Sequence, residues 1–237
     1  MQTEEIFAHF KTILDKMLNH PFYKLYFQAP YSLYTTEPFS NSITLHFGVT
    51  RGCIVDADFD YCVKFLTEQD DNSLNPCERE LRFYDAAKRH KLEKYFAECN
   101  FIGNYETDLV YYDYYEITDH DAMDTMNDEE LEYFLKRNYP KRQIHICVPL
   151  YAYPTATRLY LMRNLSKEEE DFCSRTRSPI IDRAKYVAAA LWRAYGEEEF
   201  KRIDEFCRKY GIDDLHGQNV GDINGRIVFI DYAGFFG

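Results

Sequence analysis

The chain has 237 residues, 46% of them hydrophobic, which is enough to bury the core of one large domain or of two small lobes. With 40 acidic against 28 basic side chains the formal net charge is −12, and this sign excludes a protein that coats nucleic acid through phosphate contacts. No stretch has the roughly 18 to 20 uninterrupted apolar residues of a membrane span, and the N-terminus lacks the pattern of a secretory signal peptide. We therefore expect a globular, cytoplasmic protein that binds neither nucleic acid nor membrane.

Seven cysteines are scattered along the chain, without a C-x-x-C pair and without a nearby histidine at zinc spacing. Their odd number and wide spacing are unlike a disulfide framework or a structural zinc site. Most stand beside Ile, Val, Phe or Tyr, as small buried hydrophobic side chains do in a reducing compartment. We expect all of them to be free thiols.

The first half of the chain predicts a helix, three strands, a second helix and two further strands. Apolar residues recur at helical spacing over residues 3–18, which predicts an amphipathic helix packed on a core. Alternation and a high content of β-branched and aromatic residues predict the strands. The expected strands are 43–47, 53–55, 59–65, 101–105 and 109–117, with a glycine-containing turn at 48–52.

The second helix has a strong start signal in Asn-Pro-Cys-Glu at residues 75–78. The asparagine suits the N-cap, the proline the first helical position, and the glutamate stands three residues after the cap. If the helix continues to about residue 90, Glu80 falls inside its apolar arc, where a carboxyl group is costly unless it is paired. We therefore expect Glu80 to pair with a cation, for which Lys64 on the third strand is the natural candidate.

The character of the chain changes near residues 117–120, which predicts a boundary between a first lobe, 1–117, and a second lobe, 118–237. Residues 108–138 hold ten Asp and Glu against two Lys and Arg and end in a short predicted helix, 128–138. Such a stretch is usually a solvated face, and the alternative is a surface that recognises a basic protein partner.

The remainder of the second lobe predicts mainly helices. Residues 143–163 alternate in places and are compatible with a hairpin or with irregular structure. Beyond them we expect helices over 182–195 and 197–210, a loop over 211–219, a turn at Asn224-Gly225 and a strand over 226–230 that ends before Asp231.

Several residue types in this order suit phosphoryl transfer, in which catalysis consists mainly of positioning and of neutralising charge with a divalent metal, a lysine and backbone amides. Asp214 and Asn219 are five residues apart, so one loop can present a carboxylate to a hydroxyl and an amide oxygen to Mg²⁺. Asp231 adds a second carboxylate at the end of an apolar strand. Asp213 competes for the first role, and we prefer Asp214 for its spacing.

Each feature also has a structural alternative. Lys64 would be a solvated lysine on a strand, and Glu80 would be a rim carboxylate bonded to Arg79 or Arg82. Asp214 and Asn219 would only cap a turn, and Gly48 and Gly52 would be ordinary hairpin glycines. His216 would be a structural residue of its loop. The joint occurrence of the features in one order favours phosphate chemistry.

At these residues the chain resembles the protein-kinase-like fold. The resemblance rests on Cys62-Val-Lys64-Phe, Cys77-Glu-Arg-Glu80, Asp214-Leu-His-Gly-Gln-Asn219 and Ile230-Asp231-Tyr-Ala-Gly234, and it covers about residues 43–117 and 182–234. More narrowly, the motifs resemble small kinase-like proteins of bacteria and their phages. The resemblance implies an α+β, bilobal fold with a five-stranded antiparallel N-terminal lobe plus a helix, and a reduced, mainly helical C-terminal lobe.

The resemblance also implies roles for individual residues. Lys64 would orient the phosphates of ATP, Glu80 would hold Lys64, and Asp214 would be the catalytic base, with Asn219 and Asp231 as Mg²⁺ ligands. The nucleotide would contact Gly48, Thr50, Arg51 and Gly52 over its phosphates, and Tyr115, Glu116 and Ile117 as the hinge against which adenine stacks.

The chain departs from the family pattern in three places. The turn at 48–52 is not a full G-x-G-x-x-G, and Thr50 or Arg51 would compensate for its missing amide contacts. Ile212-Asp213 precedes the expected catalytic aspartate, where the family has His-Arg or His-Gly. Only six residues follow Asp231, which leads us to expect no peptide-docking surface of the usual kind.

The sequence thus predicts an ATP- and Mg²⁺-dependent phosphotransferase that acts on a hydroxyl of a protein or of a small molecule, with residues 120–181 positioning the acceptor. The alternative is a nucleotide-binding pseudokinase that acts as a protein-interaction or inhibitory module.

Overall fold

The computed structural model describes residues 3–19, 42–47, 51–66, 75–112 and 141–233, together with a few residues between 126 and 137. It is an α+β structure with a five-stranded antiparallel sheet and, in the described part, four α-helices. The chain divides into two compact units, each built from two segments. The first unit comprises Met1–Asp71 and Phe101–Ala152, and the second comprises Asn72–Asn100 and Tyr153–Gly237.

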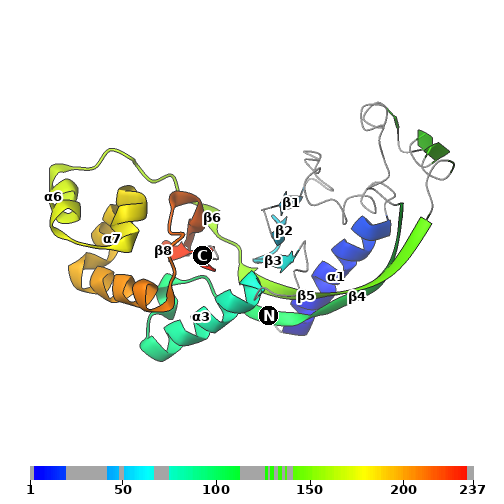
Figure 1. The fold of residues 1–237 in the computed structure, drawn as a ribbon, viewed down its shortest axis with the longest axis horizontal. Helices are drawn as coiled ribbons and strands as arrows, with labels where there is room; N and C mark the ends of the chain where they lie inside the picture. Colours follow the sequence, from blue (N-terminus) through cyan, green and yellow to red (C-terminus); the bar gives the residue numbers. More distant parts are fainter. Residues whose placement is uncertain are drawn as a thin grey trace. The chain divides into compact units, whose positions relative to one another are not determined.

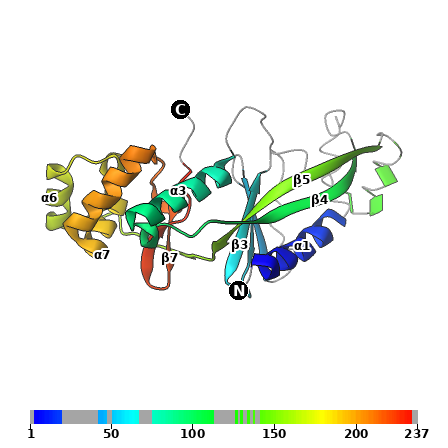
Figure 2. The ribbon, with the colours of Figure 1, turned by 90° about the horizontal axis from the view of Figure 1, so that it is seen from below.

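The first unit is a curved sheet with one helix along one face, as Figures 1 and 2 show. Its helix is α1 (Thr3–Asn19), and its strands are β1 (Ile43–Phe47), β2 (Arg51–Asp56), β3 (Tyr61–Leu66), β4 (Asn100–Tyr112) and β5 (Lys141–Pro154). The strand order is β1-β2-β3-β5-β4. The predicted helix over 3–18 is confirmed, as are the first three strands, with β2 starting two residues earlier than expected.

The core of the first unit lies between α1 and the sheet. Helical spacing places one apolar stripe of α1 on the sheet, and alternation along each strand supplies the facing side chains. The buried members are Ile6, Phe10, Ile13, Leu14, Ile54, Val63, Phe65, Ile102, Tyr105, Val148, Leu150 and Ala152. At roughly 1.5–3 kcal/mol for each large side chain removed from water, this cluster is the main source of the unit's stability.

The fifth strand differs from the prediction. Of the two strands expected over 101–105 and 109–117, residues 101–105 and 109–112 belong to one strand, β4, and residues 113–117 lie outside the described residues. The fifth strand is β5, within a stretch expected to be a hairpin or irregular. The polar residues Glu106 to Asp108, which lie between the two expected ranges, continue the strand, and Asp108 of β4 pairs with His145 of β5 at 3.0 Å. Pairing between strands distant in the sequence therefore outweighs the local polar signal.

The second unit combines helices with a small antiparallel sheet (Figure 1). Its α-helices are α3 (Pro76–His90), α6 (Lys167–Arg175) and α7 (Pro179–Tyr210), and its strands are β6 (Thr157–Arg158), β7 (Val220–Ile223) and β8 (Arg226–Phe229), in the order β6-β7-β8. Two short 3₁₀ turns, η1 (Glu93–Tyr95) and η3 (Gly217–Asn219), complete it.

The helix boundaries of the second unit follow local signals. The side chain of Asn75 accepts the amide N–H of Cys77 at 2.9 Å, so the predicted start of α3 is confirmed. The predicted break between 182–195 and 197–210 is confirmed at Gly196, whose φ of 81° interrupts α7. Helix α6 was not predicted, although Ser166 and Glu169 form a capping box that the sequence displays.

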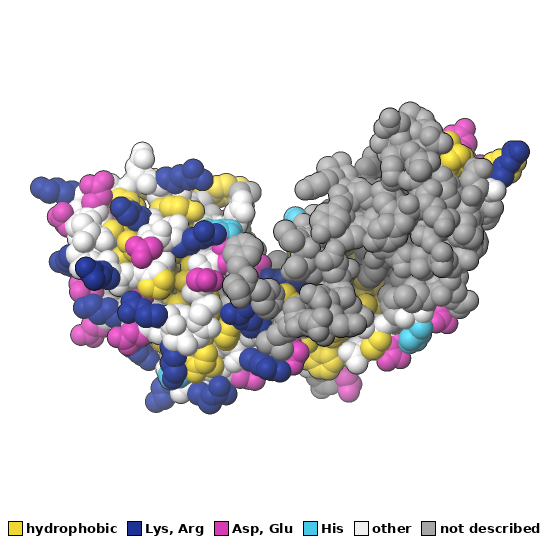
Figure 3. Space-filling model, viewed as in Figure 1, with side chains coloured by type: hydrophobic (Ala, Val, Ile, Leu, Met, Phe, Trp, Pro, Cys, Tyr) yellow, Lys and Arg dark blue, Asp and Glu magenta, His cyan; other side chains and the backbone are white. Residues whose placement is uncertain are grey.

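None of the described helices combines the length and the apolarity that a bilayer span needs. All seven cysteines are free thiols. On the face drawn in Figure 3, basic and acidic side chains are interspersed over the helices of the second unit. The short helix expected over 128–138 and the domain boundary expected at 117–118 fall largely or wholly outside the described residues.

Candidate functional site

The loop that follows α7 carries the residues expected to be catalytic. Ile212 and Leu215 are buried at 1% and 0% exposure and anchor this loop in the core of the second unit. Between these two anchors Asp213 is exposed, whereas the side chain of Asp214 is only 13% exposed. The two aspartates between these buried residues thus differ in environment, and Asp214 is the one whose side chain is shielded from solvent.

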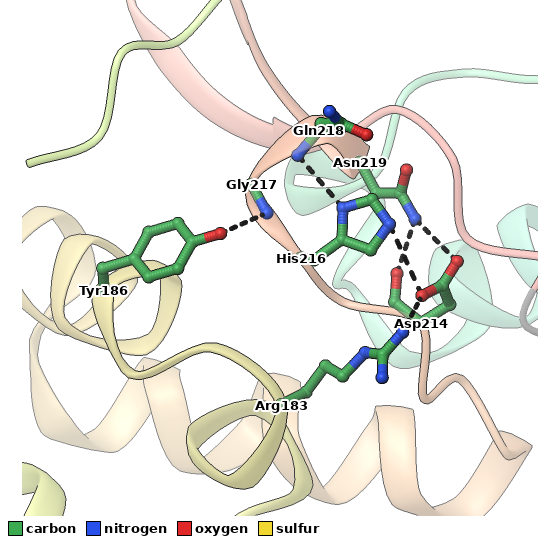
Figure 4. Close-up of polar contacts among 7 residues, drawn as sticks. All are labelled: Arg183, Tyr186, Asp214, His216, Gly217, Gln218 and Asn219. Atoms are coloured by element: carbon green, nitrogen blue, oxygen red, sulfur yellow. Dashed lines mark hydrogen bonds and ion pairs between the residues drawn. The ribbon is translucent and has the colours of Figure 1, made fainter. Parts of the chain in front are cut away.

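Asp214 and Asn219 are in direct contact, as Figure 4 shows. The side-chain nitrogen Nδ2 of Asn219 donates to the backbone oxygen of Asp214 at 2.6 Å and to its carboxylate oxygen Oδ2 at 3.1 Å. This orientation leaves the oxygen Oδ1 of Asn219 pointing away from Asp214 (Figure 4). The five-residue spacing therefore brings a carboxylate and an amide oxygen into one small loop, although the same contacts also stabilise the turn.

His216 supports the loop between these two residues. Its Nδ1 accepts the backbone N–H of Gln218 at 3.2 Å, so Nδ1 carries no proton and Nε2 does. Nε2 lies 3.5 Å from Oδ1 of Asp214. His216 thus caps η3 and places an N–H beside the carboxylate, in agreement with the structural role considered for it.

The hairpin of β7 and β8 brings the segment that contains Asp231 next to Asn219. The backbone N–H of Ile230 donates to the carbonyl oxygen of Asn219 at 2.9 Å, which continues the pairing of Val220 with Phe229 by one step. Asp231 is therefore one residue beyond the position opposite Asn219. A turn at Asn224 and Gly225, both with positive φ, closes the hairpin as the sequence predicts.

Glu80 lies on the buried face of α3, where the helical arc places it, and its side chain is 0% exposed. Its Oε2 accepts the hydroxyl of Tyr153 at 2.6 Å and its Oε1 accepts the backbone N–H of Tyr232 at 2.9 Å. The alternative of a rim carboxylate is wrong, because Glu80 is buried and Arg82 pairs with Glu78 instead. The second of these bonds ties α3 to the residue that follows Asp231.

The hydroxyl of Tyr153 stays protonated and donates its hydrogen bond to Glu80. Burial, reinforced by the Glu80 carboxylate, raises the pKa of Tyr153 well above its ordinary value, so the hydroxyl keeps its proton. The thiol of Cys99 donates in turn to the Tyr153 oxygen, with 3.2 Å between sulfur and oxygen. Tyr232 is also fixed, since its hydroxyl donates to the carbonyl oxygen of Ala97 at 2.7 Å.

Two residues of α7 contact the loop and were not predicted. The guanidinium nitrogen Nη2 of Arg183 lies 3.0 Å from Oδ1 of Asp214, and the hydroxyl of Tyr186 accepts the backbone N–H of Gly217 at 3.1 Å. They stand on either side of Ala184, whose φ of −154° and ψ of 89° interrupt the helix. The sequence contains no signal for these contacts, because they depend on how α7 packs against a loop some 30 residues later.

The remaining predicted site residues belong to the first unit. Lys64 lies on β3 opposite Cys53 of β2, and its side chain is partly buried. Arg51 and Gly52 belong to β2 itself rather than to the turn expected over 48–52. Gly52 has no room for a side chain, since a Cβ there would come within 2.5 Å of the Phe65 ring.

The structure therefore brings together Asp214, Asn219, Glu80 and the segment of Asp231 within the second unit. The pairing of Lys64 with Glu80 stays a prediction. Gly48, Thr50, Tyr115, Glu116 and Ile117 lie outside the described residues, as does most of the acidic stretch 108–138. Within the described residues, no group of three or more His, Cys, Asp and Glu side chains is arranged to hold a metal ion.

Comparison of the chain with protein-family models, with curated proteins and with solved structures finds no match in any of the three. The protein-kinase-like resemblance thus stays an expectation that rests on the sequence motifs of this chain.

The contact between Gly217 and Tyr186 leads to a prediction about the stability of the loop. A Cβ at position 217 would lie 2.8 Å from Cε2 and 3.0 Å from the hydroxyl oxygen of Tyr186. We expect Gly217→Ala to lower the free energy of unfolding by about 1–3 kcal/mol, as overpacking does in folded proteins. Urea denaturation measures the change. In the background of Tyr186→Ala the substitution is expected to cost much less, and equal costs in both backgrounds would contradict the proposed clash.

Proposed function

We propose that this protein transfers the γ-phosphoryl group of ATP, with Mg²⁺, to a hydroxyl group of a protein or small-molecule acceptor. The observation that carries the proposal is the chain of contacts in the second unit. Asn219 binds Asp214 through its side chain and Ile230 through its carbonyl, and the N–H of Tyr232 binds Glu80. Asp214 and Asn219 are thus bonded directly, and the two neighbours of Asp231 in the sequence are bonded to Asn219 and to Glu80. The kinase-like resemblance assigns these four residues, which span about 150 positions of the sequence, to one reaction.

In the proposed reaction Asp214 accepts the proton of the acceptor hydroxyl as that oxygen attacks the γ-phosphorus. The bond from the γ-phosphorus to the β,γ-bridging oxygen breaks, and ADP leaves with the electron pair. A carboxylate only 13% exposed and held at both oxygens has a defined orientation, which a positioned base needs.

The oxygen donors near the loop suit a magnesium ion that arrives with a nucleotide. Mg²⁺ is commonly bound by one or two carboxylates together with phosphate oxygens and water rather than by an all-protein cage. Oδ1 of Asn219, which the amide orientation directs away from Asp214, and the carboxylate of Asp231 are the groups that would hold it. The ion would neutralise charge on the phosphates, and Lys64 is proposed to orient them.

The experiment is a pair of measurements on the intact protein. Thermal denaturation with and without ATP and Mg²⁺ reports binding, and incubation with γ-labelled ATP, Mg²⁺ and cell lysate, followed by mass spectrometry, reports transfer. We expect ATP with Mg²⁺ to raise the melting temperature and label to appear on an acceptor. If ATP neither stabilises the protein nor supports labelling, the proposal is wrong.

A specific observation favours the alternative of a nucleotide-binding pseudokinase with an interaction or inhibitory role. Both carboxylate oxygens of Asp214 are already engaged, Oδ2 by Asn219 and Oδ1 by Arg183. A base in this state is closed to a hydroxyl unless one partner moves. Stabilisation by ATP without transfer in any lysate would support this alternative over the phosphotransferase.

A further inference from the structure

The partner of Asp214 that can move is Arg183. Asn219 is 8% exposed and contacts Asp214 at two points, so its position is fixed by the loop. The side chain of Arg183 is 50% exposed, and among the described residues its one polar contact is with Asp214, 3.0 Å from Nη2 to Oδ1. Because Arg183 is half exposed and holds Asp214 through one contact, a ligand from solution can reach its guanidinium and compete with Asp214 for it.

Two further positively polarised groups lie at or near the loop that Arg183 contacts. Nε2 of His216, which carries the proton, lies 3.5 Å from the same oxygen of Asp214. The guanidinium of Arg163 lies 6.0 Å from the ring centroid of Tyr186, whose hydroxyl binds the loop at Gly217. This grouping occurs in a chain with a net charge of −12, in which an average surface would repel an anion.

Two nearby carboxylates weaken the attraction of an anion to Arg183 but do not cancel it. Asp182 and Asp213 precede Arg183 and Asp214 in the sequence and are both exposed to solvent. A guanidinium is planar and presents parallel N–H groups, so a phosphate or a carboxylate can bind it at two points where Asp214 binds it at one. Such a ligand therefore competes well with Asp214 for Arg183.

We propose that Arg183 binds an anionic group, a phosphate or a carboxylate, that the acceptor carries near its hydroxyl, and that this contact opens Oδ1 of Asp214 to the hydroxyl. The inference rests on the proposed function in taking Asp214 as the base. The binding of an oxyanion at Arg183 does not depend on transfer and can be measured without it. The proposed role of Arg183 implies that the acceptor is an anionic alcohol rather than a neutral one.

The first test is a titration of the protein with inorganic phosphate, and separately with acetate, followed by NMR of the arginine Nε–H groups. We expect a saturable shift of the Arg183 signal, and the stronger of the two ligands distinguishes phosphate from carboxylate recognition. Arg183→Gln should lose this binding, Arg183→Lys should keep part of it, and Arg175→Gln should keep it all. Arg175 is a matched control, since it is 60% exposed and pairs with Glu197 at 2.9 Å.

The inference is overturned if neither anion shifts the Arg183 signal in a saturable way, or if Arg183→Gln binds both as the wild type does. These outcomes leave the proposed function standing, because nucleotide binding and transfer are measured separately.

The second test compares matched acceptors in the transfer reaction: glycerol, glycerol 3-phosphate and glycerate. We expect the wild type to prefer a charged acceptor. Arg183→Gln removes the contact with the anion and at the same time opens Oδ1 of Asp214 to glycerol, so we expect it to lower the ratio of kcat/KM for the charged acceptor to kcat/KM for glycerol by about tenfold or more. An equal loss for all three acceptors would show a merely structural role and overturn the inference. If the wild type transfers to none of them, the transfer proposal fails for these acceptors and the titration alone decides the role of Arg183.

Discussion

Asp214→Asn is expected to lower the rate of phosphoryl transfer by about 10²- to 10⁴-fold, the contribution that a positioned general base makes. The asparagine has nearly the same shape but cannot accept the hydroxyl proton. Transfer of label from γ-labelled ATP measures the rate. Because Arg183 is exposed, the loss of its pairing should change the free energy of unfolding by only about 0–1 kcal/mol. A large loss of activity at nearly unchanged stability would separate a chemical role from a structural one.

The matched control for this experiment is Asp213→Asn, one residue earlier in the same loop. Asp213 is exposed, whereas Asp214 contacts Asn219, so the control should transfer phosphate at nearly the wild-type rate. The opposite result, with Asp213→Asn inactive and Asp214→Asn active, would identify Asp213 as the base. Activity in both variants would show that neither aspartate of this loop is the general base.

Glu80→Ala is expected to lower the free energy of unfolding by about 2–4 kcal/mol, more than the loss of any surface ion pair would. The substitution leaves two buried donors, the Tyr153 hydroxyl and the Tyr232 N–H, without their acceptor, and each unsatisfied buried donor costs about 1–3 kcal/mol. Urea denaturation measures the loss. Glu78→Ala on the same helix is the control, since Glu78 is 40% exposed and its ion pair within the described residues is with Arg82 at the surface.

Glu80→Gln separates the structural from the functional role of this carboxylate. The amide keeps a carbonyl oxygen for the Tyr232 N–H, and its nitrogen can donate to the Tyr153 oxygen, so most of the stability should remain. The negative charge is lost, and with it the predicted pairing with Lys64. We therefore expect a raised KM for ATP in a folded protein. A normal KM for ATP would contradict the pairing, and a loss below about 1 kcal/mol for Glu80→Ala would contradict the buried network.

The features that could be predicted depend on neighbouring residues. The start of α3 was predictable because Asn75 and Pro76 act within one turn of the helix they begin. The burial of Glu80 was predictable because helical geometry alone places it between apolar side chains. The contact of Asp214 with Asn219 follows from five residues of one loop, and the hairpin that leads to Asp231 follows from Asn224 and Gly225.

The features that could not be predicted depend on packing between distant segments. Strand β5 is a strand because β3 and β4 flank it in the sheet, whereas its own residues were equally compatible with irregular structure. The donors to Glu80 come from residues 73 and 152 positions away in the sequence. No local pattern distinguishes Tyr153 or Tyr232 among 21 tyrosines.

The amino-acid sequence by itself determined which chemistry the chain can offer: acidic and amide side chains at fixed spacing, on elements whose ends are set by caps and turns. Only the tertiary structure decided the state of those groups. In the tertiary structure Arg183 pairs with Asp214, the expected base, and Tyr153 donates to Glu80, the expected partner of Lys64. Both contacts arise where a helix or strand packs against a segment far along the chain. Local signals specify elements, whereas the partners of a buried or half-buried charge are specified by packing.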